Sequence, residues 1–136
     1  MRYFLITDPD FYPNVPTMGG VYRLHCFAND EGSDVMPVPR VLGVDHEGIL
    51  YIGKATAFTD RVINLKKAIS PEFRGTSHIC GRRYKNPHYQ SFGERFPASR
   101  LCVSFEPTST PEKSEREALI AYVMRFGELP PLNRQG

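Results

Sequence analysis

One stretch of this chain combines a strand end, a lysine and an arginine at a spacing that suits the capture of a phosphate. Segment 50–54 (LYIGK) reads as the end of a strand, and a helix predicted to begin near Thr56 carries Arg61. Apolar residues surround this arginine at helical spacing: Phe58, Leu65 and Ala68. We therefore expect Arg61 on the core-facing side of its helix, where a guanidinium costs free energy unless an anion meets it. Bidentate binding of a phosphate is one such use.

Glu117 is the second candidate for chemistry on a phosphate. It lies in a helix predicted over residues 111–126, with a helix-start signal at Thr110 and Gly127 as the C-terminal cap. Apolar residues follow it at helical spacing: Ile120, Ala121 and Met124. We expect its carboxylate to lie beside packed side chains and to bind Mg²⁺, or Mn²⁺, with water and substrate completing the shell. The alternative is a plain surface ion pair with Lys113.

Taken in order, these residues resemble the motif set of the GIY-YIG nuclease family. Gly20-Val21-Tyr22 corresponds to the first half of the motif, and Tyr51-Ile52-Gly53 to the second. The arginine and glutamate helices follow, and segment 129–133 (LPPLN) is similar to the family's terminal asparagine motif. The resemblance spans residues 19–134. It implies a metal-dependent endonuclease that hydrolyses phosphodiester bonds in DNA.

The resemblance also implies a role for each tyrosine. Tyr22 and Tyr51 would line the cleft, and the first would position or activate the attacking water. Tyrosine is a poor base at neutral pH because its ordinary pKa is near 10, so it needs a nearby cation. Lys54, within the motif, is available for that purpose. For each tyrosine the alternative is a half-buried aromatic residue of a strand.

Three further site residues follow from the resemblance. Arg61 would clamp the scissile phosphate, and Asn133 would orient a neighbouring group or a phosphate. Leu65 stands where the family often has a catalytic histidine or tyrosine, so we expect His78 to supply that function. The alternatives are a surface or DNA-contacting role for His78 and a plain tail position for Asn133.

A basic stretch follows the arginine helix. Residues 74–100 contain six cationic residues and a single carboxylate, that of Glu94. The cationic residues are Arg74, Arg82, Arg83, Lys85, Arg95 and Arg100. His78 and His88 lie in the same stretch. Such a block suits a DNA backbone, and we expect Arg74, Arg82, Arg83, Lys85 and His88 to contact it. The alternative is a solvated basic loop.

The elements that must position these residues fit an α/β (α+β) chain with a small mixed or antiparallel sheet of three to four strands flanked by helices. Strands are predicted over residues 3–7, 20–27, 41–45, 49–53 and 100–106, and helices from Thr56 to before Pro71, around 88–96, and over 111–126. Segments 41–45 and 49–53 are expected to form a hairpin. The family joins its two tyrosine motifs by a short hairpin, so residues 28–45 are interpreted as an insertion.

The remaining expectations follow from the size and composition of the chain. The 136 residues suit one domain, 1–136. No segment is long and apolar enough to span a bilayer, and we expect no signal peptide. The odd cysteine count, Cys26, Cys80 and Cys102, indicates reduced thiols and a cytoplasmic location. A chain without a separate DNA-binding domain would be a stand-alone nuclease or one subunit of a homodimer. A catalytically weak nucleic-acid-binding module that retains the fold, and a protein-binding domain, are the alternatives.

Overall fold

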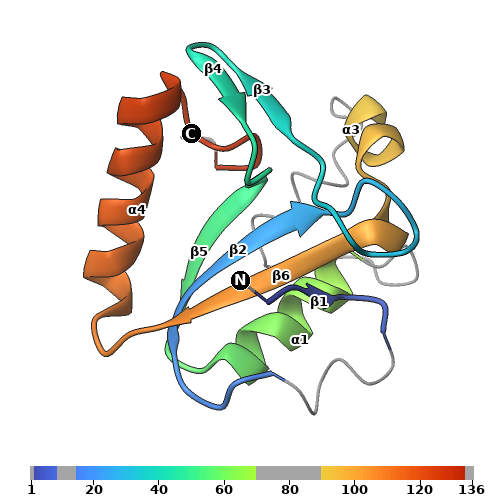
Figure 1. Ribbon diagram of the computed structural model, residues 1–136. Coiled ribbons are helices and arrows are strands. Elements are labelled where there is room, and N and C mark those ends of the chain that lie inside the picture. Colours follow the sequence, from blue (N-terminus) through green and yellow to red (C-terminus); the bar gives the residue numbers. More distant parts are fainter. Residues whose placement is uncertain (1, 9–14, 70–89, 134–136) are drawn as a thin grey trace.

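A four-stranded antiparallel sheet forms the centre of the protein. The computed structural model describes residues 2–8, 15–69 and 90–133. The strands lie in the order β1 (Phe4–Leu5), β6 (Leu101–Pro107), β2 (Gly20–Cys26) and β5 (Tyr51–Ala55). Figure 1 shows β2 and β6 as the long central pair. The expected small antiparallel sheet is confirmed, as are the strands around residues 20–27 and 100–106.

Helices cover both faces of the sheet. On one face, α1 (Phe58–Ile69) buries Phe58, Val62 and Leu65, each at most 2 % exposed, against the side chains of β2 and β6. The short helix α3 (Gln90–Arg95) and the 3₁₀-helix η3 (Ala98–Arg100) lead into β6. On the other face, α4 (Pro111–Phe126) packs Tyr122 and Phe126 against Val21 and Ile52. Because successive side chains of a strand alternate between faces, β2 supplies Val21 to one core and Tyr22 to the other.

The predicted hairpin between segments 41–45 and 49–53 is wrong. Instead, β4 (Gly43–Asp45) pairs with β3 (Val38–Arg40), while β5 pairs with β2 in the main sheet. Val41 and Leu42 form the tip of the β3–β4 hairpin. Residues 28–45, interpreted as an insertion, thus build a two-stranded element of their own. It stands beside the end of α4 in Figure 1.

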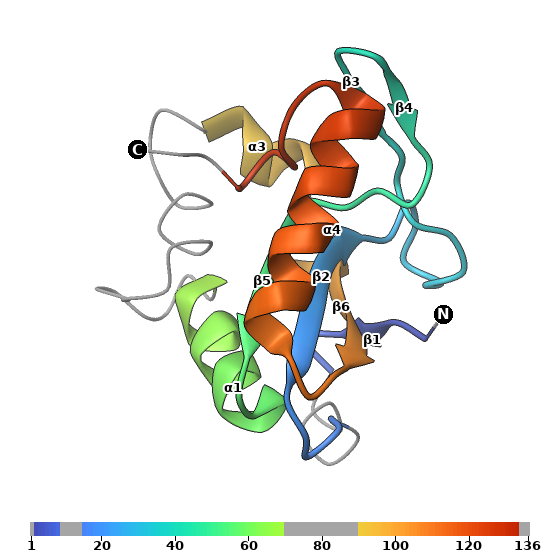
Figure 2. The ribbon, with the colours of Figure 1, turned by 90° about the vertical axis from the view of Figure 1, so that its left-hand side faces the viewer.

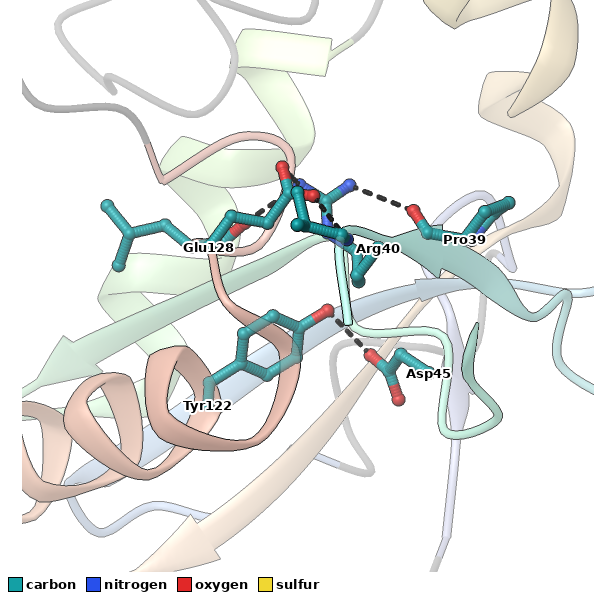
Figure 3. Close-up of polar contacts among 7 residues, drawn as sticks. Pro39, Arg40, Asp45, Tyr122 and Glu128 are labelled. Atoms are coloured by element: carbon teal, nitrogen blue, oxygen red, sulfur yellow. Dashed lines mark hydrogen bonds and ion pairs between the residues drawn. The ribbon is translucent and has the colours of Figure 1, made fainter. Parts of the chain in front are cut away.

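The side chain of Asp45 shapes the turn that follows β4. Its side chain is 1 % exposed and accepts three hydrogen bonds. The backbone N–H groups of Glu47 (2.9 Å) and Ile49 (3.0 Å) bind its two carboxylate oxygens, and the Tyr122 hydroxyl donates to Oδ2 at 2.9 Å (Figure 3). The carboxylate therefore closes the turn over residues 45–49 and ties it to α4.

A second polar contact joins the hairpin to the end of α4. Arg40 forms an ion pair with Glu128 and donates from Nη2 to the Leu129 carbonyl at 3.0 Å (Figure 3). The N–H of Val41 donates to the other Glu128 oxygen at 2.8 Å. Gly127, with φ 79°, ends the helix in the left-handed conformation that favours glycine, as expected for the cap. The hairpin is therefore fixed at both its base and its tip.

His25 is buried in the sheet as a neutral imidazole. It is 1 % exposed. Its Nδ1 donates to the Glu47 carbonyl at 2.8 Å, which leaves Nε2 to accept from the Ser104 hydroxyl at 2.9 Å. Burial lowers the pKa of His25 to about 4, helped by Arg23 and opposed by the Glu47 hydrogen bond and by Asp45.

Because His25 is buried as the neutral form, we expect the free energy of unfolding to fall already between pH 6.5 and 5, above the pH range in which most carboxylates titrate. The unfolded chain takes up a proton near pH 6.5, whereas the folded imidazole does so only near pH 4. Stability is unaffected above pH 6.5 and falls as the pH drops below it, by about 2 kcal/mol between pH 7.5 and 5. Urea unfolding at both pH values checks this. The variant His25→Gln should lack most of that loss, and an equal loss in the variant would contradict the assignment.

The described helices and cysteines bear on two expectations drawn from the composition, those on membrane spans and on reduced thiols. Among the described helices, none combines the length and apolar character that crossing a bilayer requires. Cys26 and Cys102 are buried free thiols. Burial raises the pKa of both, to about 11 for Cys26. Neither thiol is therefore activated for nucleophilic chemistry.

Candidate functional site

A groove of about 500 Å³ opens where β5 ends and both long helices begin. Strand β5 contributes Lys54, and the first turns of α1 and α4 form the walls. The lining residues are Lys54, Ala55, Thr56, Ala57, Asp60, Arg61, Asn64, Pro111 and Glu112. Strand, connecting turn and helix follow one another directly in sequence between residues 51 and 69, so the lysine and the arginine are held on one rigid unit.

Arg61 lies in this groove and not among core side chains, so its expected placement is wrong. Its side chain is exposed, whereas its neighbours Phe58, Val62 and Leu65 form the buried stripe of α1. At about 100° per residue, Arg61 lies about 60° from the centre of that stripe. A long side chain at such a margin extends into solvent. The arginine is thereby open to a ligand.

Neither cation of the groove forms an ion pair within the described part of the chain. Within residues 2–8, 15–69 and 90–133, no carboxylate forms an ion pair with Arg61 or Lys54. Glu106 of β6 pairs with Arg23 at 2.8 Å. Two cations without such partners on one groove wall form an anion-binding arrangement.

Glu117 faces solvent, so its expected position beside packed groups is wrong. Its side chain is 64 % exposed, and its Oε1 lies 4.0 Å from Lys113 Nζ. Ile120 and Met124, expected to pack beside it, are 56 % and 79 % exposed. The buried stripe of α4 runs through Ala118, Tyr122 and Phe126, about 140° around the helix from Glu117.

Glu115 is the carboxylate of α4 that approaches the two cations. It is half-buried. Burial raises the pKa of its carboxyl group, while Lys54 and Arg61 act to lower it and the neighbouring Glu112 raises it further. An influence from both Lys54 and Arg61 places Glu115 within electrostatic range of the groove. Glu112, three residues before it on α4, lines the groove itself.

The two tyrosines lie together on the neighbouring strands β2 and β5. Tyr22 and Tyr51 have ring centroids 6.1 Å apart, and the Cα of Tyr22 is opposite that of Gly53. A methyl group on Gly53 would come within 2.4 Å of Tyr22 Cζ, so this close approach requires glycine. Tyr22 is 1 % exposed and packs in the core, whereas Tyr51 is half-buried. The residues that line the groove include neither ring.

Asn133 holds the outer edge of β5. Its Oδ1 accepts from the Ile52 N–H at 2.7 Å, and its Nδ2 donates to the Ile52 carbonyl at 2.9 Å. The N–H of Leu132 donates to the Leu50 carbonyl at 2.9 Å. The amide therefore takes the place of a neighbouring strand at the residue next to Tyr51. Asn133 thus contacts the Tyr51-Ile52-Gly53 segment through the backbone of Ile52.

His78 and residues 74–89 of the basic stretch fall outside the described residues. These are His78, proposed as the catalytic helper, and Arg74, Arg82, Arg83, Lys85 and His88, proposed as DNA contacts. Of the same stretch, Arg100 is described, and it pairs with Asp30 at 2.8 Å away from the groove.

Three groove residues were missed from the sequence, Asp60, Asn64 and Glu112, and so was Glu115, which lies three residues beyond Glu112 on α4. A signal for Glu115 was present, because it precedes Ala118, Tyr122 and Phe126 by three, seven and eleven residues on the buried stripe. For Asp60 and Asn64 no such signal existed, since both read as ordinary solvent-facing positions of α1.

Comparison with protein-family models, with curated proteins and with solved structures yields no match to this chain. Among the described residues, no three His, Cys, Asp or Glu side chains gather as a complete metal site. The functional assignment therefore depends on the groove itself.

Proposed function

We propose that this protein is a metal-dependent endonuclease of the GIY-YIG type that hydrolyses phosphodiester bonds in DNA at the groove between β5, α1 and α4. One observation carries the proposal: Lys54 and Arg61, without an ion-pair partner among the described residues, line the same groove as Glu112 of α4, and both act on the charge of Glu115 three residues further along that helix. Phosphoryl chemistry needs that combination, because the phosphate requires cations and a divalent metal requires carboxylates.

Each groove residue has a task that its geometry permits. The exposed guanidinium of Arg61 offers two parallel N–H donors to a phosphate, and the ammonium of Lys54 adds a point charge beside it. Both charges are in place before substrate arrives, so no reorganisation is needed as negative charge develops. The half-buried Tyr51 lies three residues before Lys54 and is more accessible than Tyr22 to the attacking water.

The donor set of α4 fits a hard divalent cation. Mg²⁺ is usually held by one or two protein carboxylates, with water and substrate phosphate as the other ligands. Glu115 would be the principal ligand, and Glu112, one helical turn before it, the second. When bound, such an ion neutralises phosphate charge and supports the leaving oxygen. The raised pKa of Glu115 is consistent with a carboxylate that gains from a cation nearby.

A nucleic-acid-binding module without catalysis is the second candidate. The burial of Tyr22 favours it, because a ring that is 1 % exposed cannot contact solvent water in this arrangement. The cations of the groove would then hold a backbone phosphate without cleaving it.

A plasmid assay separates these candidates. Supercoiled DNA is incubated with the wild-type protein in Mg²⁺, in Mn²⁺ and in EDTA, while binding to a short duplex is measured at two salt concentrations. The nuclease proposal predicts nicking that EDTA stops and added metal restores. Salt-dependent binding without nicking would favour the module. Absence of both would favour a domain that binds protein.

A further inference from the structure

A second hollow, of about 600 Å³, adjoins the groove at the same end of the sheet. It lies between the chain that enters β2 and the loop that joins β6 to α4. Figure 2 shows both segments beside each other, near the start of α1. Thr56 and Pro111 line the hollow as well as the groove. The two depressions are therefore continuous, and one ligand can occupy both.

The hollow differs from the groove in its chemistry. None of the described residues that line it is charged, whereas the groove holds two cations. Met18 and Pro107 give the hollow an apolar surface. Beside them it presents three hydroxyl groups, those of Thr56, Thr108 and Ser109. The hollow therefore suits the uncharged part of a ligand whose anionic part lies in the groove.

The backbone beneath Met18 is fixed, although its side chain is 53 % exposed. The Met18 carbonyl accepts from the N–H of Phe58, the first residue of α1, at 3.0 Å. The Gly19 carbonyl accepts from the Thr108 N–H at 3.2 Å. A methyl group on Gly19 would come within 2.3 Å of the Thr56 carbonyl oxygen, so this close approach requires glycine. The methionine is thus held beside the helix that carries the arginine of the groove.

We propose that this hollow binds the sugar and base of one unpaired nucleotide whose phosphate lies in the groove. The proposal rests on the groove being the phosphate site of the proposed function. A nucleotide joins an anionic phosphate to an uncharged nucleoside, which matches the cationic groove and its neutral extension. Methionine and proline side chains commonly contact the faces of unstacked bases. Serine and threonine hydroxyls donate or accept at base edges.

The occupied hollow implies a substrate class. A base that contacts the protein on both its face and its edge cannot remain stacked and paired in a duplex. A fully paired duplex must therefore expend free energy to release that base, whereas a bulged or single-stranded nucleotide is already free. The expected substrate is DNA with an unpaired nucleotide next to the phosphate that is cleaved.

Fluorescence anisotropy in EDTA, with three DNA duplexes, tests the hollow. The first duplex is fully paired, the second carries a one-nucleotide bulge, and the third carries the same bulge without its base. The wild type should bind the bulged duplex at least about tenfold more tightly than the paired one, because the base is already released. Removal of the base from the bulge should abolish most of this preference. Equal affinity for the bulged and paired duplexes, or for the bulges with and without a base, would overturn the proposal.

Met18→Ala shows whether the methionine contacts the base. In this variant, removal of the base from the bulge should have little further effect on affinity, because the contact is already lost. Met124→Ala is the matched control: Met124 is 79 % exposed on α4 and does not line the hollow, so this variant should respond to base removal like the wild type. Circular dichroism confirms that both variants are folded. A wild-type response to base removal in Met18→Ala would overturn the assignment of the hollow.

These measurements separate the hollow from the proposed hydrolysis, because EDTA prevents metal-dependent cleavage. A base-dependent preference for the bulge without nicking in Mg²⁺ would leave the hollow supported and reject the nuclease. EDTA-sensitive nicking without any preference for the bulge would support the nuclease and reject the hollow. Absence of binding to all three duplexes would reject both.

Discussion

Replacing Arg61 by alanine is expected to lower cleavage turnover by about two orders of magnitude or more while leaving the protein as stable as the wild type. Removal of one preorganised charge donor typically costs 10²- to 10³-fold. Arg61 is exposed and has no ion-pair partner among the described carboxylates, so its loss leaves no described carboxylate unpaired. The free energy of unfolding should change by no more than about 0.5 kcal/mol.

Cleavage and urea unfolding of Arg61→Ala should be measured on one preparation. Arg116→Ala, on an exposed position of α4 outside the groove, is the matched control for loss of a positive charge and should retain activity. Arg61→Lys separates charge from geometry, because lysine cannot offer the paired donors. Substantial activity in Arg61→Ala, or a loss of several kcal/mol in its stability, would reject the phosphate clamp.

Asp45→Ala is expected to destabilise the protein by about 3 kcal/mol or more, because three buried donors each lose a hydrogen bond whose loss costs about 1 to 3 kcal/mol. Its carboxylate is 1 % exposed and is the hydrogen-bond acceptor for two backbone N–H groups and the Tyr122 hydroxyl. Alanine would leave all three donors buried without that acceptor. The turn after β4 and its attachment to α4 depend on this one side chain.

Tyr122→Phe is the graded control for Asp45, because it removes one of the three hydrogen bonds. It should cost about 1 to 1.5 kcal/mol. Urea unfolding of both variants at pH 7.5 keeps His25 neutral and separates this effect from the acid sensitivity described above. A stability of Asp45→Ala within about 1 kcal/mol of the wild type would show that the turn does not depend on the carboxylate.

The elements of the fold followed from the sequence wherever the local signal was strong. Apolar spacing and a stop before Pro71 gave α1, and Pro111 with Gly127 bounded α4 as observed. The pairing of β3 with β4 could not be predicted from the sequence. Segments 41–45 and 49–53 both read as strands with a short turn between them. In the structure Asp45 closes that turn and binds Tyr122 of a distant helix, and the second strand pairs with β2.

The candidate site was predictable as a set of motifs but not as a geometry. Lys54 and Arg61 were expected, and they line one groove. The expected inward position of Glu117 was wrong because residues 118–124 are apolar on nearly every face, so sequence alone does not show which side meets the sheet. Tertiary packing of Tyr122 and Phe126 decides that, and it brings Glu115 inward. Asn133 was expected to act on a neighbour, but its partner, the Ile52 backbone, depends on β5 lying at the sheet edge.

Plasmid nicking by Glu115→Gln and Glu117→Gln, measured side by side in Mg²⁺, tests the groove as the catalytic centre most directly. Both changes remove one negative charge and preserve shape, from positions two residues apart on α4. The geometry predicts a rate at least about 100-fold lower for Glu115→Gln, the scale lost with one preorganised catalytic group, and a near wild-type rate for Glu117→Gln. Wild-type cleavage by Glu115→Gln, or loss of cleavage in Glu117→Gln alone, would contradict the assignment.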